Sequence, residues 1–212
     1  MMPDLFEGDA RQALDEGAVL LRGQALPIDT MLLAAIETIS SQSPFRRMTT
    51  PGGFQMSVAM TNCGSVGWVT DRSGYRYAAR DPDRDTPWPA MPPQFAGLAG
   101  DAARQAGFAG FSPDACLINC YEPGARLSLH QDKDEQDYRH PVVSVSLGLP
   151  AIFQFGGLRR TDRPQRVPLR HGDIVVWGGP ARLAYHGVLA LKDGVHPLVG
   201  RRRLNLTFRK AL

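Results

Sequence analysis

Hydrophobic residues recur at helical spacing in two places along the chain. Residues 29–42 carry apolar side chains at the spacing of one helix face, with Asp29 placed as an N-cap. A second helix is expected to follow the prolines at 92–93 and to stop at Gly107. Both predicted helices lie in the first half of the chain.

The remaining segments favour strands, because polar and apolar residues alternate between turn signals. Residues 54–61 alternate strictly, 17–26 read as a short strand, and 67–78 read as a hairpin that turns near Ser73 and Gly74. Eight further candidates are separated by glycine and proline turns: 115–121, 126–132, 142–148, 151–155, 166–170, 173–177, 183–188 and 203–209. This pattern predicts a mainly β protein of the α+β class, a jelly roll with the N-terminal helices packed outside.

Length and composition indicate one globular domain spanning residues 1–212, of which 43% are hydrophobic and 21% charged. Residues 1–16 are expected to form a loosely tied arm. Cys63, Cys116 and Cys120 lack metal-ligand spacing and suit a reducing compartment. No signal peptide and no apolar run of about 20 residues is visible, so we expect a cytoplasmic protein without a membrane segment. The net charge of +3 adds little evidence for a nucleic-acid partner, and no feature suggests an obligate oligomer, so we expect a monomer.

A histidine and a carboxylate share one face of the expected strand 126–132. His130 and Asp132 are two positions apart, so their side chains point the same way. Alone, such a pair is usually a surface feature, and His186, in an apolar stretch downstream, could equally be a core residue. Together, two histidines and one carboxylate are the donor set of a non-haem iron(II) site, which leaves positions open for a co-substrate and O₂.

The stretch "RLNLTFR" (203–209) alternates polar and apolar residues throughout. Its polar face carries Arg203, Asn205, Thr207 and Arg209. One interpretation is a surface strand with its polar side in water. The other is that two guanidiniums and an amide line a cavity and hold a dicarboxylate such as 2-oxoglutarate, since arginine grips carboxylates in a fixed geometry. Asn119 and Tyr121 share a strand face and would add to this cavity.

Several blocks together resemble, in order, the AlkB family of iron(II)/2-oxoglutarate-dependent dioxygenases, which repair alkylated nucleic-acid bases. The blocks span residues 48–64, 114–135, 143–158, 171–179 and 203–209. They are similar, in order, to the bacterial DNA-repair branch. The resemblance implies a double-stranded β-helix with its catalytic core at residues 114–209 and a nucleotide-recognition lid at about residues 48–80.

The resemblance also assigns cofactors and activity. It implies iron(II) held by His130, Asp132 and His186. It implies 2-oxoglutarate held by Asn119, Tyr121, Arg203, Asn205 and Arg209, with Thr207 on the same face. The activity implied is oxidative demethylation of bases such as 1-methyladenine and 3-methylcytosine in DNA, with RNA as a further candidate. Formaldehyde is released while 2-oxoglutarate and O₂ become succinate and CO₂.

Aromatic residues and arginine alternate in the expected hairpin. The candidates for substrate contact there are Trp68, Tyr75, Arg76 and Tyr77. Core packing is one interpretation of the aromatics, and base stacking with phosphate contact is the other. The resemblance favours the second, with Trp68 stacking on a flipped base. It also implies nucleic-acid contacts by Arg160, Thr50, Pro51 and Gly52, and it places Asp134 near the damaged base as a catalytic-site carboxylate.

Three alternatives stay open at this point. A related oxygenase acting on a small molecule or a protein would keep the metal triad and the arginines. A non-catalytic nucleic-acid-binding module would bind single strands without turnover. A metal-binding jelly roll without oxygenase activity would leave the alternation of residues 203–209 unexplained. The preference among single-stranded DNA, duplex DNA and RNA does not follow from the sequence.

Overall fold

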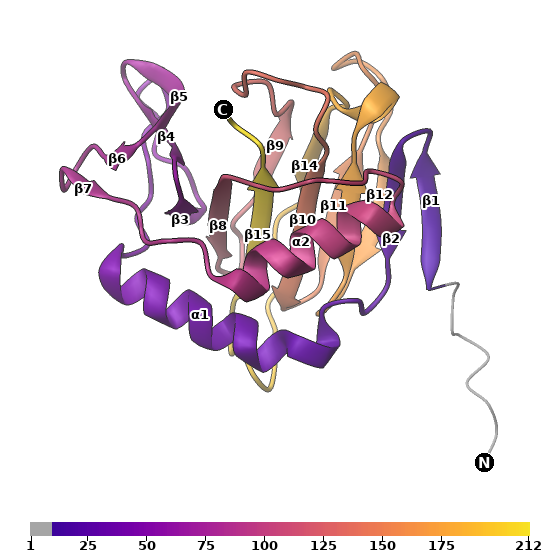
Figure 1. The fold of residues 1–212 in the computed structure, drawn as a ribbon, viewed down its shortest axis with the longest axis horizontal. Coiled ribbons are helices and arrows are strands. Elements are labelled where there is room, and N and C mark those ends of the chain that lie inside the picture. The colour runs from indigo at the N-terminus through magenta and orange to yellow at the C-terminus, as the bar shows by residue number, and fades with distance from the viewer. Residues whose placement is uncertain (1–9) are drawn as a thin grey trace.

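In the computed structural model, residues 10–212 are described, and they form two facing β-sheets with helices on one outer side (Figure 1). Within this range the larger sheet has seven strands, in the order β1 (Arg11–Asp15), β2 (Ala18–Leu21), β13 (Ile174–Trp177), β10 (Val142–Gly148), β15 (Arg203–Arg209), β8 (Ala115–Tyr121) and β3 (Ala59–Gly64). The smaller sheet has four, in the order β12 (Gln165–Leu169), β11 (Ala151–Phe155), β14 (His186–Val188) and β9 (Leu127–His130). The predicted double-stranded β-helix is confirmed.

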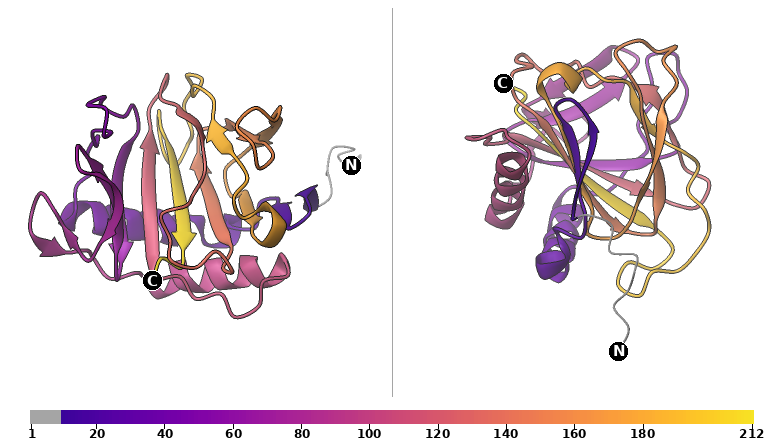
Figure 2. Two further views of the ribbon diagram at one scale, coloured as in Figure 1. Left: turned by 90° about the horizontal axis from the view of Figure 1, so that it is seen from above. Right: turned by 90° about the vertical axis from the view of Figure 1, so that its right-hand side faces the viewer.

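Both helices cover the outer face of the larger sheet, as Figure 2 shows. α1 (Asp29–Gln42) and α2 (Pro93–Gln105) confirm the two helices predicted from apolar spacing. Their buried side chains pack against the sheet in one apolar core, which includes Leu32, Ile36, Phe95, Val145, Leu206 and Phe208. Asp29 is the first helical residue and not the N-cap, because the 3₁₀ turn η1 (Leu26–Ile28) leads directly into α1.

A second core lies between the two sheets, and β15 separates the two cores. Leu204, Leu206 and Phe208 face the helices, whereas the polar residues of β15 face the smaller sheet. All residues of β15 are buried. The interpretation of this segment as a surface strand with its polar side in water is therefore wrong.

A two-stranded hairpin stands beside the sheets. β4 (Gly67–Asp71) and β5 (Gly74–Ala78) confirm the hairpin predicted at 67–78, and the short pair β6 (Arg80–Asp81) and β7 (Thr86–Pro87) follows it. Asn62 of β3 fixes the hairpin, because its side-chain amide donates to the Trp68 carbonyl and accepts from the Trp68 N–H, both at 3.0 Å. The hairpin base is thus tied to the larger sheet through a buried amide.

One predicted strand is wrong over its first part. Alternation predicted a strand over 54–61, but β3 begins only at Ala59. The chain makes a tight turn before it, in which the Thr50 N–H donates to the Phe54 carbonyl at 2.8 Å and Gly53 has a φ of 83°. Glycine adopts this backbone conformation at little cost, so local hydrogen bonds outweigh the alternating pattern here.

The N-terminal segment also differs from expectation. Residues 11–15 were expected in a loosely tied arm, but they form β1 and pair with β2. Residues 1–9 of that arm lie outside the described residues. β2 ends at Leu21, before the end predicted at residue 26, because the chain turns at Gly23 with a φ of 61°. No helix within residues 10–212 is long and apolar enough to cross a membrane.

The core under the helices contributes to the stability of the fold. Leu206 is fully buried there, so Leu206→Ala is expected to lower the free energy of unfolding by about 2–5 kcal/mol. Denaturant titration measures this loss. Val195→Ala is the control, because Val195 is 75% exposed and its truncation should change stability by no more than about 0.5 kcal/mol. Equal losses in both variants would contradict the assigned core.

Candidate metal centre and adjoining cavity

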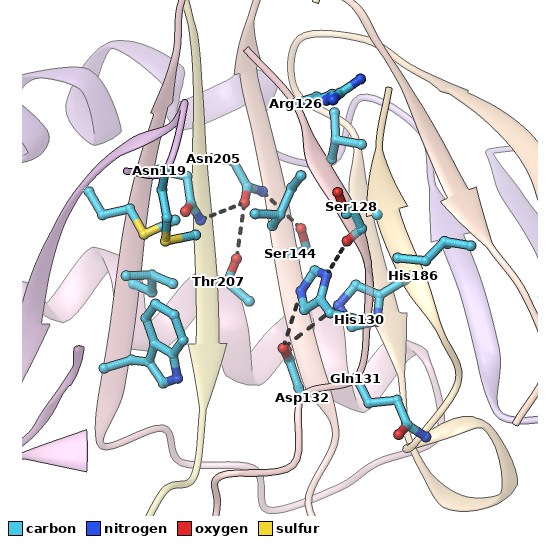
Figure 3. Close-up of a pocket in the computed structure, with 18 of the residues that line it drawn as sticks. Asn119, Arg126, Ser128, His130, Gln131, Asp132, Ser144, His186, Asn205 and Thr207 are labelled. Atoms are coloured by element: carbon cyan, nitrogen blue, oxygen red, sulfur yellow. Dashed lines mark hydrogen bonds and ion pairs between the residues drawn. The ribbon is translucent and has the colours of Figure 1, made fainter. Parts of the chain in front are cut away.

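Three predicted ligands converge between the two sheets. His130 ends β9 and His186 begins β14, and the two residues pair directly across these antiparallel strands. Asp132 follows two residues after His130. The Nε2 atoms of both histidines lie 3.7 Å from Oδ1 of Asp132, and one donor atom from each residue lies within 4.8 Å of the others (Figure 3). Strand pairing therefore brings together residues that are far apart in the sequence.

Backbone carbonyls orient both imidazoles. Nδ1 of His130 lies 2.8 Å from the Ser128 carbonyl, and Nδ1 of His186 lies 3.0 Å from the Ala184 carbonyl. A carbonyl oxygen only accepts, so each Nδ1 carries the proton and donates it. The lone pair of each Nε2 is then available to a metal ion.

Electrostatics gives His186 and Asp132 the protonation states that a metal needs. Burial and the neighbouring His130 lower the pKa of His186 to about 4, so this imidazole is neutral at pH 7. Burial alone would raise the pKa of Asp132, but the Arg209 guanidinium and the two histidines hold that pKa well below its usual range. Arg209 donates to Oδ2 of Asp132 through Nε at 2.8 Å, and its Nη2 forms an ion pair with the same oxygen at 2.7 Å. Two imidazoles and a carboxylate are a donor set that fits iron(II).

A cavity of about 760 Å³ opens next to the triad. Every residue predicted to hold 2-oxoglutarate lines it: Asn119, Tyr121, Arg203, Asn205, Thr207 and Arg209. Alternation on β15 and β8 places these side chains on the face toward the smaller sheet, and the two strands pair in register with Asn205 opposite Asn119.

Arg203 has unused hydrogen-bonding capacity at the bottom of this cavity. Its side chain is buried, its Nη2 donates to Ser146 at 2.9 Å, and its guanidinium lies 5.1 Å from the ring centroid of Tyr121. Nε and Nη1 have no hydrogen-bond partner among the described residues. Burial lowers the pKa of Arg203, because a buried cation without an anionic partner is unfavourable. The unused donors of Arg203 leave room for a hydrogen-bonded ion pair with a carboxylate of 2-oxoglutarate.

A network of amides and hydroxyls holds the cavity wall between Arg203 and the triad. The Asn205 amide donates to Oγ of Ser144 at 2.8 Å, and its oxygen accepts from Asn119 at 3.2 Å and from Thr207 at 3.0 Å (Figure 3). Sequence reasoning missed Ser144, and also Ser146 beneath Arg203. The stretch "VSVSLG" (143–148) alternates serine with apolar residues, and this pattern indicates two serines on one strand face.

Part of the hairpin covers the cavity mouth. Trp68 and Tyr75 stack with ring centroids 5.7 Å apart and an angle of 17° between their planes. The indole N–H of Trp68 donates to Oδ2 of Asp134 at 2.8 Å. These three residues line the cavity together with Thr50 and Arg160, and the substrate contacts predicted for all five stay predictions.

Four other predicted substrate residues do not line this cavity among the residues that the structure describes: Arg76, Tyr77, Pro51 and Gly52. Arg76 faces the other side of the hairpin and pairs with Asp71 at 2.7 Å. Tyr77 is partly buried, and its hydroxyl donates to Glu135 at 2.6 Å. Contacts of these four residues with nucleic acid stay predictions.

Comparisons with known proteins agree with this geometry. The family profile described as the 2OG-Fe(II) oxygenase superfamily matches residues 18–209. Alpha-ketoglutarate-dependent dioxygenase AlkB of Salmonella typhimurium is 62% identical over 212 residues, covering 99% of this chain and 98% of that protein. The protein of the same name from Escherichia coli is 59% identical over 213 residues, covering 99% and 98%.

A solved structure shares the arrangement of the elements. The structure of OsALKBH1 superposes with a TM-score of 0.82 at 29% sequence identity, covering 94% of this chain and 99% of that one. The profile match includes the three metal ligands and all six polar residues of the adjoining cavity. On this evidence the chain belongs to the AlkB family of the 2OG-Fe(II) oxygenase superfamily.

Proposed function

We propose that this iron(II)/2-oxoglutarate-dependent dioxygenase removes alkyl groups from N-alkylated bases in DNA, such as 1-methyladenine and 3-methylcytosine, and accepts RNA as well. The observation that carries this proposal is the shared cavity. It joins the triad of His130, Asp132 and His186 to the unpaired donors of Arg203, and its mouth is formed by Trp68 and Asp134. The cytoplasmic location and the monomeric state stay predictions.

The chain's own residues prepare the reaction. With iron(II) and 2-oxoglutarate bound, O₂ oxidises the keto acid to succinate and CO₂, and its second oxygen atom hydroxylates the N-methyl carbon, which then leaves as formaldehyde. His130 and His186 would offer their Nε2 atoms to the metal, and Asp132 would offer Oδ1 because Arg209 occupies Oδ2. Arg203 would receive the far carboxylate of the keto acid.

Residues at the cavity mouth would select the damaged base. A methyl group on N1 of adenine or N3 of cytosine blocks pairing, so such a base is already loosened and costs less to extrude. It also carries a positive charge near neutral pH. The Asp134 carboxylate, held by the Trp68 indole at 2.8 Å, would stabilise this cation, and the stacked Trp68 and Tyr75 offer an aromatic surface to the base.

The central test is demethylation of a single-stranded oligonucleotide containing one 1-methyladenine, followed by mass spectrometry. We expect loss of the methyl group that requires iron(II) and 2-oxoglutarate, and no loss with Asp132→Ala, which removes a metal ligand. Steady succinate formation without demethylation would reject the base as substrate and retain the oxygenase. Absence of succinate under all conditions would reject the metal centre itself.

Arg203 gives a separate prediction for the keto acid. Arg203→Lys keeps the charge but loses the forked donors, so the KM for 2-oxoglutarate should rise about 10- to 100-fold, the scale of one hydrogen bond to a charged group. Steady-state succinate formation measures the change. Arg202→Lys is the matched control, because Arg202 is the exposed neighbour of Arg203 and should leave that KM unchanged.

Asp134 gives a prediction for base selection. Asp134→Asn preserves an acceptor for the Trp68 indole but removes the charge, so kcat/KM for cationic 1-methyladenine should fall roughly 5- to 10-fold relative to neutral 3-methylthymine. Competition between the two oligonucleotides measures this ratio. Asp137→Asn, in the same loop but paired with Arg139, should leave the ratio unchanged. An unaltered ratio in Asp134→Asn would exclude the electrostatic role.

A further inference from the structure

A buried cluster of charged side chains lies between the hairpin and the metal centre, and the reaction chemistry does not require all of it. It contains two carboxylates, Asp132 and Glu135, and two guanidiniums, Arg182 and Arg209. The side chains of Glu135 and Arg182 are only 2% and 4% exposed. Buried charges are costly unless each is fully paired, so the way in which these groups share contacts has consequences.

One oxygen of Glu135 and one nitrogen of Arg209 each have two partners. Oε1 of Glu135 accepts from the Tyr77 hydroxyl at 2.6 Å and lies 3.3 Å from Nε of Arg209. The same Nε donates to Oδ2 of Asp132 at 2.8 Å. Glu135 and the metal ligand Asp132 therefore compete for Arg209, and Tyr77 occupies the Glu135 oxygen that takes part in this competition.

Arg182 holds the cluster in place. Its Nη2 donates to Oε2 of Glu135 at 2.9 Å, its Nη1 to the carbonyl of Asp132 at 2.7 Å, and its Nε to the carbonyl of His140 at 2.9 Å. Three contacts to one loop fix Glu135 relative to Asp132. A displacement of the hairpin would therefore remove the Tyr77 hydroxyl from Glu135 without moving Glu135 itself.

Tyr77 connects this cluster to the substrate side of the hairpin. It pairs directly with Trp68 across β4 and β5, and it lies two residues from Tyr75 on the same strand face. Burial raises the pKa of Tyr77 well above its ordinary value, so its hydroxyl stays protonated and donates to Glu135. The two aromatic residues at the cavity mouth and the contact at Glu135 thus belong to one paired hairpin.

We propose that Tyr77 and Glu135 are positioning residues that couple the hairpin to the metal centre. With the hairpin closed, the Tyr77 hydroxyl satisfies Glu135 and leaves Arg209 to hold Asp132. With the hairpin displaced, Glu135 attracts Arg209 away from Asp132 and loosens the metal ligand. Because coupling between two sites is reciprocal, a metal ion at Asp132 also favours the closed hairpin. This inference rests on the proposed metal centre and does not require the base substrate.

The test uses Mn²⁺ alone as the probe, with the full chain. Calorimetry gives the Mn²⁺ affinity, and amide hydrogen exchange reports on residues 67–78. We expect Mn²⁺ to slow exchange in the wild-type hairpin. In Tyr77→Phe we expect about threefold to tenfold weaker Mn²⁺ binding and no slowing of hairpin exchange by the metal, since one hydrogen bond carries the coupling.

Tyr138→Phe is the matched control. Its hydroxyl donates to the Lys133 carbonyl at 2.7 Å in the same loop, but it makes no contact with Glu135. This variant should keep both the wild-type Mn²⁺ affinity and the slowing of hairpin exchange. Equal effects of Tyr77→Phe and Tyr138→Phe would overturn the coupling, because any loss of a hydroxyl near the loop would then suffice.

A double variant separates coupling from a merely structural role. Glu135→Gln removes the charge that attracts Arg209. The double variant Tyr77→Phe with Glu135→Gln should therefore bind Mn²⁺ more tightly than Tyr77→Phe alone. The metal should still not slow hairpin exchange in the double variant, because the Tyr77 hydroxyl is absent. Further weakening in a double variant that still unfolds cooperatively would overturn the proposal. If that variant does not fold, hairpin exchange in Tyr77→Phe decides the question.

The wild-type measurement distinguishes the two possible failures. Absence of Mn²⁺ binding would overturn the proposed metal centre of His130, Asp132 and His186. Mn²⁺ binding at that centre with unchanged exchange in residues 67–78 would overturn only the coupling through Tyr77 and Glu135.

Discussion

The site depends on one buried ion pair, between Arg209 and Asp132. Removing two charges from water is favourable only when each finds full compensation, and here two nitrogens of Arg209 engage a single oxygen of Asp132. The other oxygen is left directed at the two histidines. One contact therefore stabilises a polar interior, keeps the carboxylate ionised and orients a metal donor.

The arrangement of layers allows the fold to tolerate this polar interior. Each central strand of the larger sheet has two buried faces, and its apolar face packs under α1 and α2. The polar face of β15 is then free to form the cavity wall opposite the histidines of the smaller sheet. One face of β15 contributes to the apolar core and the other face to the cavity wall, so the two demands do not compete for the same positions.

Much of this could be predicted from local pattern. Alternation located β8, β10, β11 and β15, and helical spacing located α1 and α2. It failed at 54–58, where a glycine turn interrupts an apparently regular strand, and at 11–15, where pairing with β2 makes a strand from a polar segment. In both places the deciding hydrogen bonds are absent from any pattern of hydrophobicity.

The sequence by itself determined the donors: two histidines and a carboxylate for a metal, and a polar strand face with two arginines for a dicarboxylate. Only the tertiary structure decided how the arginines divide their tasks. Arg209 is paired with Asp132, whereas Arg203 retains two unpaired donors in the cavity. It also decided that Tyr77 reaches Glu135 while Tyr75 faces the cavity. These distinctions depend on strand register and burial between distant segments, and neither is encoded in the spacing of residues along the chain.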